Sequence, residues 1–498
     1  MTDPANLSLS LYTLGKTHES VASSLVDPVK RTGEFPSQPP ACAQNQQNHS
    51  KQGHLLVRWS PCKLVSFAVT LKTSNETEGN HLKPKRILGI IMAGGKGERL
   101  LPLTEVRSKP AVPFGGKYRI IDFVLSNFVN SGITSLYVLV QYRSQSLIEH
   151  LRHSWQIGGR LTQSFVSVVP PQMRARDGWY EGTADAVYQN LNLIDDWAPD
   201  VIAVFGADHV YRMDIQQMVQ EHLEHDADAT VAALPVPIEA AGGFGILEAD
   251  EAGRMVGFEE KPTAPKPMPA RQGYALSSMG NYLFKTDTLV PLLKRDASRP
   301  GPHDFGRNIV PELLEDHRVY VYNLHNNEIP GLRSYEEQGY WRDVGTLEAY
   351  WQANMDVLGE HPLFDLRNTD WPILSSGYDG PMAALVRTHA DDSMIGPGSH
   401  CVDADIRKSI IGRGVRIEQG AYLEECVILD DVHIGPHARL RRVIADRRST
   451  VPAYSRIGYD AGHDRKRFHV SHSGLVVLRH PSSTDPHMLR RASLLLPL

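Results

Sequence analysis

The chain has 498 residues, of which 41% are hydrophobic, and a formal net charge of −5 at pH 7. A chain of this length is typical of about two to four domains of roughly 150 residues each. The mildly acidic balance argues against nucleic-acid binding, and no apolar run is long enough to span a bilayer, so we expect neither nucleic acid nor a membrane as partner.

Cysteine usage indicates the redox compartment. The 4 cysteines show no C-x-x-C spacing. They are Cys42, Cys62, Cys401 and Cys426. Such a set favours a reduced, cytoplasmic protein without structural zinc.

Residues 1–84 differ in composition from the rest of the chain. They are rich in Ser, Asn, Gln, Pro and His, and bury too little apolar surface to offset the entropy of ordering. A weak alternation over residues 55–71 allows a strand or two. We interpret the segment as a poorly ordered extension, native or added by an over-long translation start, and a targeting segment is the alternative.

The most informative segment follows an apolar run of strand length at residues 87–92. It carries three glycines, Gly94, Gly95 and Gly97, and three cations, Lys96, Arg99 and Lys109. Glycines let backbone N–H groups turn toward an anion, and the cations neutralise it. The spacing fits neither the P-loop nor G-x-G-x-x-G. We therefore predict a polyphosphate-binding loop, with a simple strand-to-helix turn as the alternative.

From residue 86 onward, apolar runs alternate with helical periods, which predicts a mostly parallel sheet with crossover helices. Strands are expected at residues 87–92, 136–140, 165–169 and 201–205. Helical faces are expected at Ile121, Val124, Leu125, Phe128 and Val129, at Leu147, Ile148 and Leu151, and, on one helix, at Val187, Leu191 and Ile194. In such folds, chemistry gathers at the carboxyl ends of strands, where the glycine loop and Asp208 are expected.

The pattern changes after Trp371-Pro372. Aliphatic residues then recur at six-residue steps, at Ile411, Ile417 and Leu423, at Ile434 and Leu440, and at Val451 and Ile457. This period predicts stacked turns of a left-handed parallel β-helix that share one core.

The predicted fold class is α/β, with a Rossmann-like, mostly parallel sheet followed by this β-helix. The predicted segments are an extension (1–84), a catalytic domain (85–360), a linker (361–390), the β-helix domain (391–478) and a tail (479–498).

Long motifs carry a family resemblance. The glycine loop reads Ala93-Gly-Gly-Lys-Gly-Glu-Arg-Leu100, followed by Pro102-Leu-Thr104 and Lys109-Pro110, and resembles the signature of sugar-phosphate nucleotidyltransferases. Three further motifs are similar to bacterial glucose-1-phosphate adenylyltransferases, namely Pro113-Phe-Gly-Gly-Lys-Tyr-Arg-Ile-Ile-Asp-Phe123, Trp179-Tyr-Glu-Gly-Thr-Ala-Asp-Ala186 and Tyr340-Trp-Arg-Asp-Val-Gly-Thr-Leu-Glu-Ala-Tyr350. The resemblance implies adenylyl transfer from ATP to glucose 1-phosphate, with release of pyrophosphate, in glycogen synthesis.

The resemblance also assigns roles to single positions. The nucleotide-binding positions are Ala93, Gly94, Gly95, Gly97, Arg99 and Lys109, and the catalytic ones are Arg99, Lys109 and Asp208. Glucose 1-phosphate is assigned to Tyr180, Gly245, Glu260, Lys261 and Ser278, and a regulatory relay to Gln141 and Trp179.

Mg²⁺ is the expected cofactor. An acid at a strand end is often only a helix cap, but beside a triphosphate loop a carboxylate suits Mg²⁺. The resemblance implies Asp208 and Asp343 as the metal-holding pair, although Ala207 replaces the family's usual glycine. Because the attacking phosphate is already an anion, we expect no covalent intermediate and no catalytic histidine, with His209 a structural neighbour.

Regulation is where the sequence departs from its relatives. Val106 stands where members activated by fructose 1,6-bisphosphate carry lysine, and Asp196 where an AMP-inhibited relative has arginine. The remaining cations still predict a pocket for a small anionic effector, and they are Arg107, Arg119, Arg439, Arg441 and Arg442. The resemblance also implies a homotetramer.

Three alternatives stay open. One is a sister nucleotidyltransferase for another nucleotide or sugar, against which the long motifs argue. Another is a non-catalytic regulatory subunit, although the loop and metal residues are retained. A hexapeptide acyltransferase is disfavoured because no suitable catalytic histidine context is present.

Overall fold

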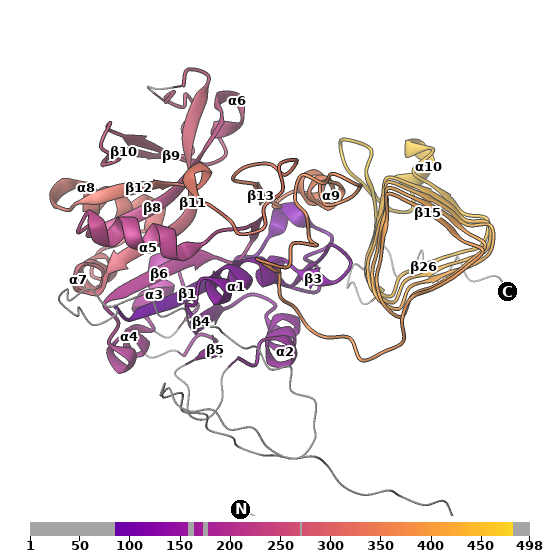
Figure 1. The fold of residues 1–498 in the computed structure, drawn as a ribbon, viewed down its shortest axis with the longest axis horizontal. Helices are drawn as coiled ribbons and strands as arrows, with labels where there is room; N and C mark the ends of the chain where they lie inside the picture. Colours follow the sequence, from indigo (N-terminus) through magenta and orange to yellow (C-terminus); the bar gives the residue numbers. More distant parts are fainter. Residues whose placement is uncertain (1–84, 158–163, 173–177, 269–270, 482–498) are drawn as a thin grey trace, which may run out of the picture. The chain divides into compact units, whose positions relative to one another are not determined.

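The computed structural model describes residues 85–157, 164–172, 178–268 and 271–481 (Figure 1). The chain divides into two compact units, Met1–Asn80 and His81–Leu498, and every described residue belongs to the second. The extension predicted at residues 1–84 and most of the predicted tail lie outside the described residues.

A nine-stranded sheet forms the centre of the catalytic part of the described chain. Its strands are β1 (Ile87–Ala93), β4 (Ser135–Val140), β5 (Phe165–Val169), β6 (Val201–Gly206), β8 (Ala229–Pro237), β9 (Gly245–Ala249), β10 (Met255–Glu260), β11 (Tyr274–Lys285) and β12 (Val319–Asn323). The predicted Rossmann-like parallel sheet is confirmed at β5, β4, β1 and β6, and β11 extends it with antiparallel neighbours.

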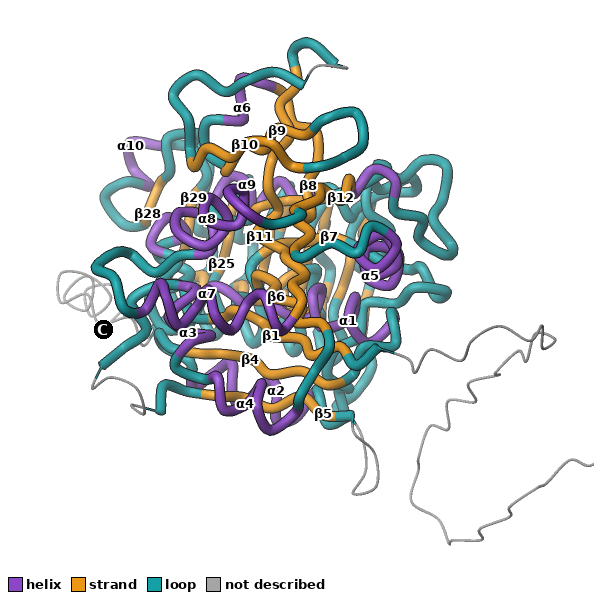
Figure 2. Tube along the Cα trace, turned by 90° about the vertical axis from the view of Figure 1, so that its left-hand side faces the viewer, coloured by secondary structure: helices purple, strands orange, loops and turns teal. Residues whose placement is uncertain are grey.

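Helices cover both faces of this sheet (Figure 2). One core contains residues of α1 (Ile121–Asn130), α2 (Gln145–Ser154), α5 (Ile215–Glu224) and α6 (Ile238–Ala241). The other contains residues of α3 (Thr183–Tyr188), α4 (Leu191–Trp197), α7 (Thr286–Ala297) and α8 (Val310–Asp316). Ile91 faces the first core and Ile90 the second, because a central parallel strand is buried on both sides. None of the helices in the described ranges has the length and apolar character needed to cross a membrane.

Short elements connect these layers and carry much of the site. They are η1 (Glu98–Leu100), η2 (Lys109–Ala111), β2 (Pro113–Phe114), β3 (Tyr118–Arg119), β7 (His209–Tyr211), η3 (Phe305–Ile309), η4 (Leu324–Asn326), β13 (Trp341–Asp343) and α9 (Leu347–Met355).

The single helix predicted through Val187, Leu191 and Ile194 is wrong, since the chain breaks between α3 and α4. The Asn190 side chain donates to the Ala186 carbonyl and, at 3.0 Å, to the Tyr180 hydroxyl. Asparagine competes with the helical backbone in this way. The break therefore ties Tyr180 to the helix pair.

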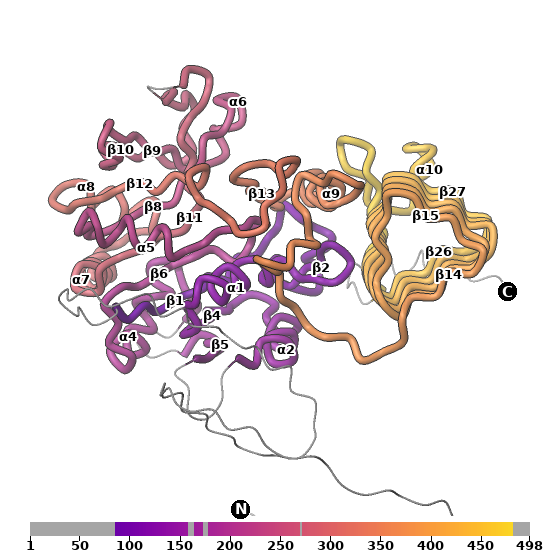
Figure 3. Tube along the Cα trace, viewed as in Figure 1, coloured from indigo at the N-terminus to yellow at the C-terminus, as the bar shows by residue number. Residues whose placement is uncertain are grey.

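The C-terminal part is a coil of three sheets with a triangular section (Figure 1). Figure 3 follows the chain from α9 into the coil. Its elements are β14 (Ala384–Val386), β15 (His389–Asp391), β16 (Met394–Ile395), β17 (His400–Val402), β18 (Asp405–Arg407), β19 (Ile410–Ile411), β20 (Arg416–Ile417), β21 (Tyr422–Glu424), β22 (Val427–Ile428), β23 (His433–Ile434), β24 (Arg439–Arg441), β25 (Val443–Ala445), β26 (Thr450–Val451), β27 (Arg456–Ile457), α10 (Ala461–Asp464), β28 (His469–Val470) and β29 (Val476–Leu478). The predicted parallel β-helix is confirmed.

Two details of the coil differ from the sequence pattern. Ile411 pairs with Ile428, and Ile428 with Ala445, so these two turns run in steps of six, six and five residues, and the short step interrupts the six-residue period. The first strand begins at Ala384 and not at 391, inside the predicted linker. All residues of β14 and β15 are exposed, whereas the aliphatic residues that mark the later turns, such as Ile411 and Ile417, are buried.

An apolar core also joins the coil to the catalytic part. Phe114 and Tyr350 pack in one cluster with Val427 and Ile444 of the coil. The predicted effector cation Arg107 lies at this junction.

His222 gives the first testable prediction. Its side chain is 1% exposed, its Nδ1 lies 2.8 Å from the Thr230 hydroxyl, and burial lowers the pKa of His222 to about 4. The unfolded chain therefore binds one more proton between pH 6.5 and 4, so up to about 3 kcal/mol of stability is lost as pH falls through that window. When the pH is lowered from 7.5 to 5.5, the thermal unfolding midpoint of the His222→Gln variant should fall by less than that of the wild type.

The matched control is exposed His225, just beyond the same helix. An equal flattening of the pH dependence in His225→Gln would contradict the assignment to buried His222.

Candidate active site

The glycine-rich loop follows β1 and lines a cavity of about 720 Å³. Gly97 has left-handed backbone with a φ of 64°, and a Cβ there would lie 3.0 Å from the Lys109 Cβ. Both conformation and space therefore favour glycine. Gly94 and Gly95 also line the cavity, whereas the side chain of Ala93 is buried in the core and only its backbone can serve the loop.

Lys109 lies between the two predicted metal-holding acids. Its Nζ is 3.1 Å from Asp208 Oδ2 and 2.7 Å from Asp343 Oδ1, and its side chain is 7% exposed. Burial acts to lower the pKa of Lys109, but the two carboxylates outweigh it and the pKa is raised. For Asp208, burial acts to raise the pKa. Interactions with His209 and Lys109 outweigh burial and hold the pKa of Asp208 well below its usual range. The ionised forms are therefore favoured.

A short ladder explains why acids so distant in sequence meet. Strands β7 and β13 are antiparallel, with Asp343 opposite His209 and Trp341 opposite Tyr211. Asp208 directly precedes β7, so the ladder brings the two carboxylates to one place.

This cluster fits a divalent cation. Ligand atoms of Asp208, His209 and Asp343 all lie within 4.8 Å of one another. The Asp208 side chain is 40% exposed and the Asp343 side chain 19%, so an ion can reach both. Two carboxylates beside a phosphate loop are the ligands that a hard cation prefers. His209, predicted only as a structural neighbour, also packs against Trp341 in a tilted arrangement, with ring centroids 4.6 Å apart.

Arg99 lines the same cavity from η1. Its Nη2 lies 3.5 Å from Asp343 Oδ2, and its side chain is 70% exposed. Such a weakly held cation is able to turn toward a polyphosphate.

The predicted sugar-phosphate residues form a second group beside the cavity, at the ends of β9 and β10. A Cβ on Gly245 would lie 2.7 Å from the Phe258 ring, so the close packing of this ring favours glycine. Lys261 follows with Nζ 3.1 Å from Glu260 Oε1. Ser278 lies in β11, where its hydroxyl accepts from the Gly280 N–H. Of the five, Tyr180 lines the cavity itself.

The two predicted relay residues flank Tyr180. Gln141 donates to the Tyr180 carbonyl at 3.3 Å and accepts from its N–H at 3.2 Å. Trp179 is 64% exposed. Gln141 therefore holds the backbone of a cavity residue.

Sequence reasoning missed two residues of the cavity wall, Thr183 and Asp304. The Thr183 hydroxyl donates to Asp304 at 2.8 Å. The two loops can touch because Gly182 has no side chain. A Cβ there would lie 2.0 Å from the Pro302 carbonyl oxygen. Only the fold brings them together, so no local motif could have identified the pair.

A second, basic cavity of about 290 Å³ lies between the catalytic part and the coil. Its cations are Lys117, Arg119, Arg413, Arg447 and Arg448. Burial, with Arg447 nearby, lowers the pKa of Arg119 to about 10. The negative charge of a bound anion would act against this lowering, because an opposite charge favours the charged guanidinium.

Among the cations predicted for this pocket, Arg119 lines it and the others do not. Arg107 is 3% exposed and lies 2.8 Å from Asp446 in a buried ion pair. The other three contact different partners, with Arg439 over Tyr422, Arg441 near Glu424, and Arg442 near Glu425 and over Trp351. The linear pattern showed charge but not which side of the coil each strand presents.

Comparison with known proteins agrees with this geometry. Residues 88–360 match the family described as nucleotidyl transferase, and residues 383–478 match the GlmU-like C-terminal hexapeptide family. The fold and site thus define a nucleotidyltransferase, a class that generally uses a divalent metal.

Relatives narrow the class further. Glucose-1-phosphate adenylyltransferase of Thermodesulfovibrio yellowstonii is 48% identical over 394 residues, which are 79% of this chain and 96% of the relative. The enzyme of Anaeromyxobacter sp. is 48% identical over 411 residues (80% and 100%), and that of Deinococcus radiodurans 44% over 410 residues (80% and 98%). The chain therefore belongs to the glucose-1-phosphate adenylyltransferase family, which confirms the predicted resemblance.

Proposed function

We propose that the protein transfers the adenylyl group of ATP to α-D-glucose 1-phosphate, giving ADP-glucose and pyrophosphate. The observation that carries this proposal is Lys109 between two acids at the rim of a glycine-lined cavity. The family membership specifies the substrates. ADP-glucose is an activated sugar, which suits the activating step of glycogen synthesis.

The reaction needs positioning and charge neutralisation more than proton transfer. The glucose 1-phosphate oxygen attacks the α-phosphorus of ATP in line, and pyrophosphate leaves. Backbone N–H groups at Gly94, Gly95 and Gly97 cradle the phosphates. Arg99 and Lys109 stabilise the departing pyrophosphate, and no covalent intermediate is required.

Asp208 and Asp343 would hold the divalent ion, for which we propose Mg²⁺. When bound, this ion supplies positive charge that reduces repulsion between the two reacting phosphates. Lys109 contacts both carboxylates and so holds them close together.

The sugar phosphate is proposed to bind at the second group of residues. Lys261 contacts its phosphate, Glu260 accepts from sugar hydroxyls, and Tyr180 and Ser278 complete the contact, while Gly245 gives the ligand room. Exposed Lys261 is placed to supply the main charge.

The test is pyrophosphate release with Mg²⁺ and glucose 1-phosphate, offering ATP, UTP, GTP or dTTP in parallel. We expect strong preference for ATP. Activity with another nucleotide would indicate the sister-enzyme alternative. A folded protein that is silent with all four would indicate the regulatory-subunit alternative and contradict the proposal.

We propose the basic cavity as the site of a small anionic effector, and its chemistry predicts the effect of Arg447→Gln. Removing this cation should raise the effector concentration for half-maximal response about tenfold, because a charge-assisted contact is lost. The measurement titrates inorganic phosphate, fructose 1,6-bisphosphate and AMP in the pyrophosphate assay. Exposed Arg456 of the same coil is the control, and an equal shift in Arg456→Gln would contradict the site.

The homotetramer and the cytoplasmic location stay predictions. Light scattering of the full chain tests the first. The buried free thiols of Cys401 and Cys426 are compatible with a reducing compartment.

A further inference from the structure

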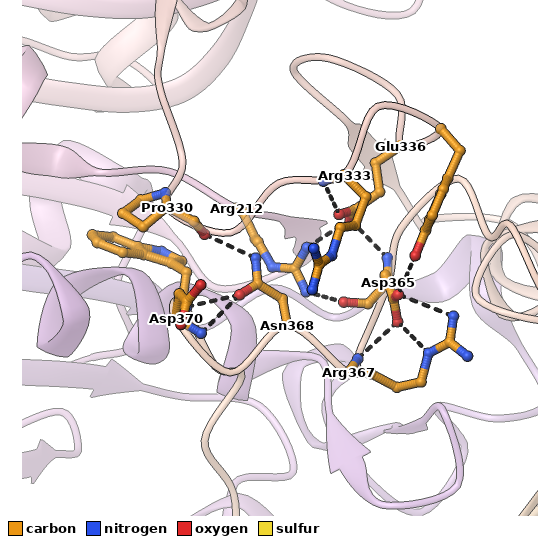
Figure 4. Close-up of polar contacts among 10 residues, drawn as sticks. Arg212, Pro330, Arg333, Glu336, Asp365, Arg367, Asn368 and Asp370 are labelled. Carbon is orange, nitrogen blue, oxygen red and sulfur yellow. Dashed lines mark hydrogen bonds and ion pairs between the residues drawn. The ribbon is translucent and has the colours of Figure 1, made fainter.

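A buried ion pair lies at the end of the β7–β13 ladder opposite the two acids of the proposed metal site. Arg212 directly follows β7, its side chain is 3% exposed, and its Nη1 lies 2.8 Å from Glu336 Oε2. Its Nη2 donates to the Asp365 carbonyl, and its guanidinium carbon lies 4.3 Å from the Phe364 ring centroid. Figure 4 shows the contacts of Arg212 with Glu336 and Asp365. One side chain therefore ties the end of β7 to two separate loops.

Glu336 connects the same two loops from the other side. Its Oε2 accepts from the Asp365 N–H at 2.8 Å, and its Oε1 accepts from the Arg333 N–H at 3.0 Å. The Asp365 carboxylate in turn accepts from the Tyr335 hydroxyl and from Arg367 Nε, each at 2.8 Å (Figure 4). The segment that leads into β13 is thus held on both sides by charge-assisted hydrogen bonds.

The Arg212–Glu336 ion pair fixes the register of the β7–β13 ladder, which brings Asp208 and Asp343 together. Strands β7 and β13 pair at Trp341, Arg342 and Asp343 only. A ladder this short is marginal by itself, and a slip of one residue would turn Asp343 to the opposite face. Because Arg212 follows β7 and Glu336 precedes β13, their contact resists such a slip.

The Arg212–Glu336 ion pair is better explained by the loop positions that it fixes than by a gain in folding stability. A buried ion pair is often no more stabilising than apolar side chains of similar volume, since desolvation of both charges offsets their attraction. Its directional hydrogen bonds, however, fix the two loops at one position. We propose that Arg212 and Glu336 are positioning residues that hold Asp343 beside Asp208 for a divalent ion. This inference rests on the metal role proposed above for the two acids.

The test uses full-length protein carrying Arg212→Met and Glu336→Leu together, which removes both charges and keeps the volume similar. Mn²⁺ is titrated in the presence of α,β-methylene-ATP, and free Mn²⁺ is followed by electron paramagnetic resonance. We expect about tenfold weaker Mn²⁺ binding at an unchanged thermal midpoint. We also expect kcat to fall more than KM for glucose 1-phosphate rises. Arg212→Lys, which keeps the charge, should retain most of the affinity.

Two further variants make the result decisive. Arg299→Met removes an exposed arginine that lies 3.1 Å from Glu312, and it should bind Mn²⁺ as wild type does. Asp343→Asn should lose Mn²⁺ binding outright. If it does not, the metal role of the acids fails, and not merely their positioning.

Wild-type Mn²⁺ affinity in the folded double variant would overturn the positioning role. Should the double variant unfold, Glu336→Gln replaces it, because the amide keeps the size and removes the charge. Wild-type affinity in that variant would overturn the proposal equally.

Discussion

The Asp208→Asn variant is expected to lose about 10³-fold in kcat while it stays folded. The substitution removes one of two carboxylates that face Lys109 and keeps the side-chain volume. Folding should survive because Lys109 keeps its shorter contact, 2.7 Å, with Asp343. The measurement is pyrophosphate release at saturating ATP and glucose 1-phosphate over a range of Mg²⁺ concentrations, with circular dichroism as the check of folding.

The matched control is Asp316→Asn, at an exposed acid that ends α8. It should leave kcat at the wild-type level. If Asp208→Asn regained the wild-type kcat at high Mg²⁺, Asp208 would contribute to ion affinity but not to the transition state, and the proposed electrostatic role would be wrong.

The periodicity of hydrophobic residues was sufficient to predict the strands and helices of the parallel core. The run at residues 87–92 became β1, and the spacing from Ile121 to Val129 became one face of α1. Burial on both sides of a strand and on one side of a helix leaves a direct trace in the sequence. The glycine loop was equally readable, because Gly97 needs left-handed backbone.

Features that depend on contacts between separate segments of the chain could not be predicted from local sequence patterns. The break at Asn190 depends on a hydrogen bond to Tyr180, and the pairing of Thr183 with Asp304 depends on two loops meeting. Arg107 looked like an effector cation, but Asp446 neutralises it at the junction with the coil. A linear pattern reports that a charge exists and not which partner the fold supplies.

The Lys261→Met variant is expected to raise KM for glucose 1-phosphate by about 100-fold, with a smaller change in kcat. Lys261 has left-handed backbone, with a φ of 51°, directly before Pro262. A non-glycine residue in this conformation costs free energy, and such strain concentrates at functional sites. Its Nζ stands 3.1 Å from Glu260, and its side chain is 56% exposed, so a ligand phosphate can reach it.

Lys266→Met is the control, because Lys266 is a nearby lysine of similar exposure, 63%, that pairs with Glu248 at 2.7 Å. If both variants raised KM alike, the effect would come from the overall charge of this surface. Lys261→Arg should recover part of the affinity, since the cation returns with a different shape.

The changes in KM and kcat of the Lys261→Met variant together show which role Lys261 has. A rise in KM alone means that Lys261 binds substrate and transition state equally, whereas an equal fall in kcat and kcat/KM would mean that it acts only in the transition state, contrary to the binding role proposed here.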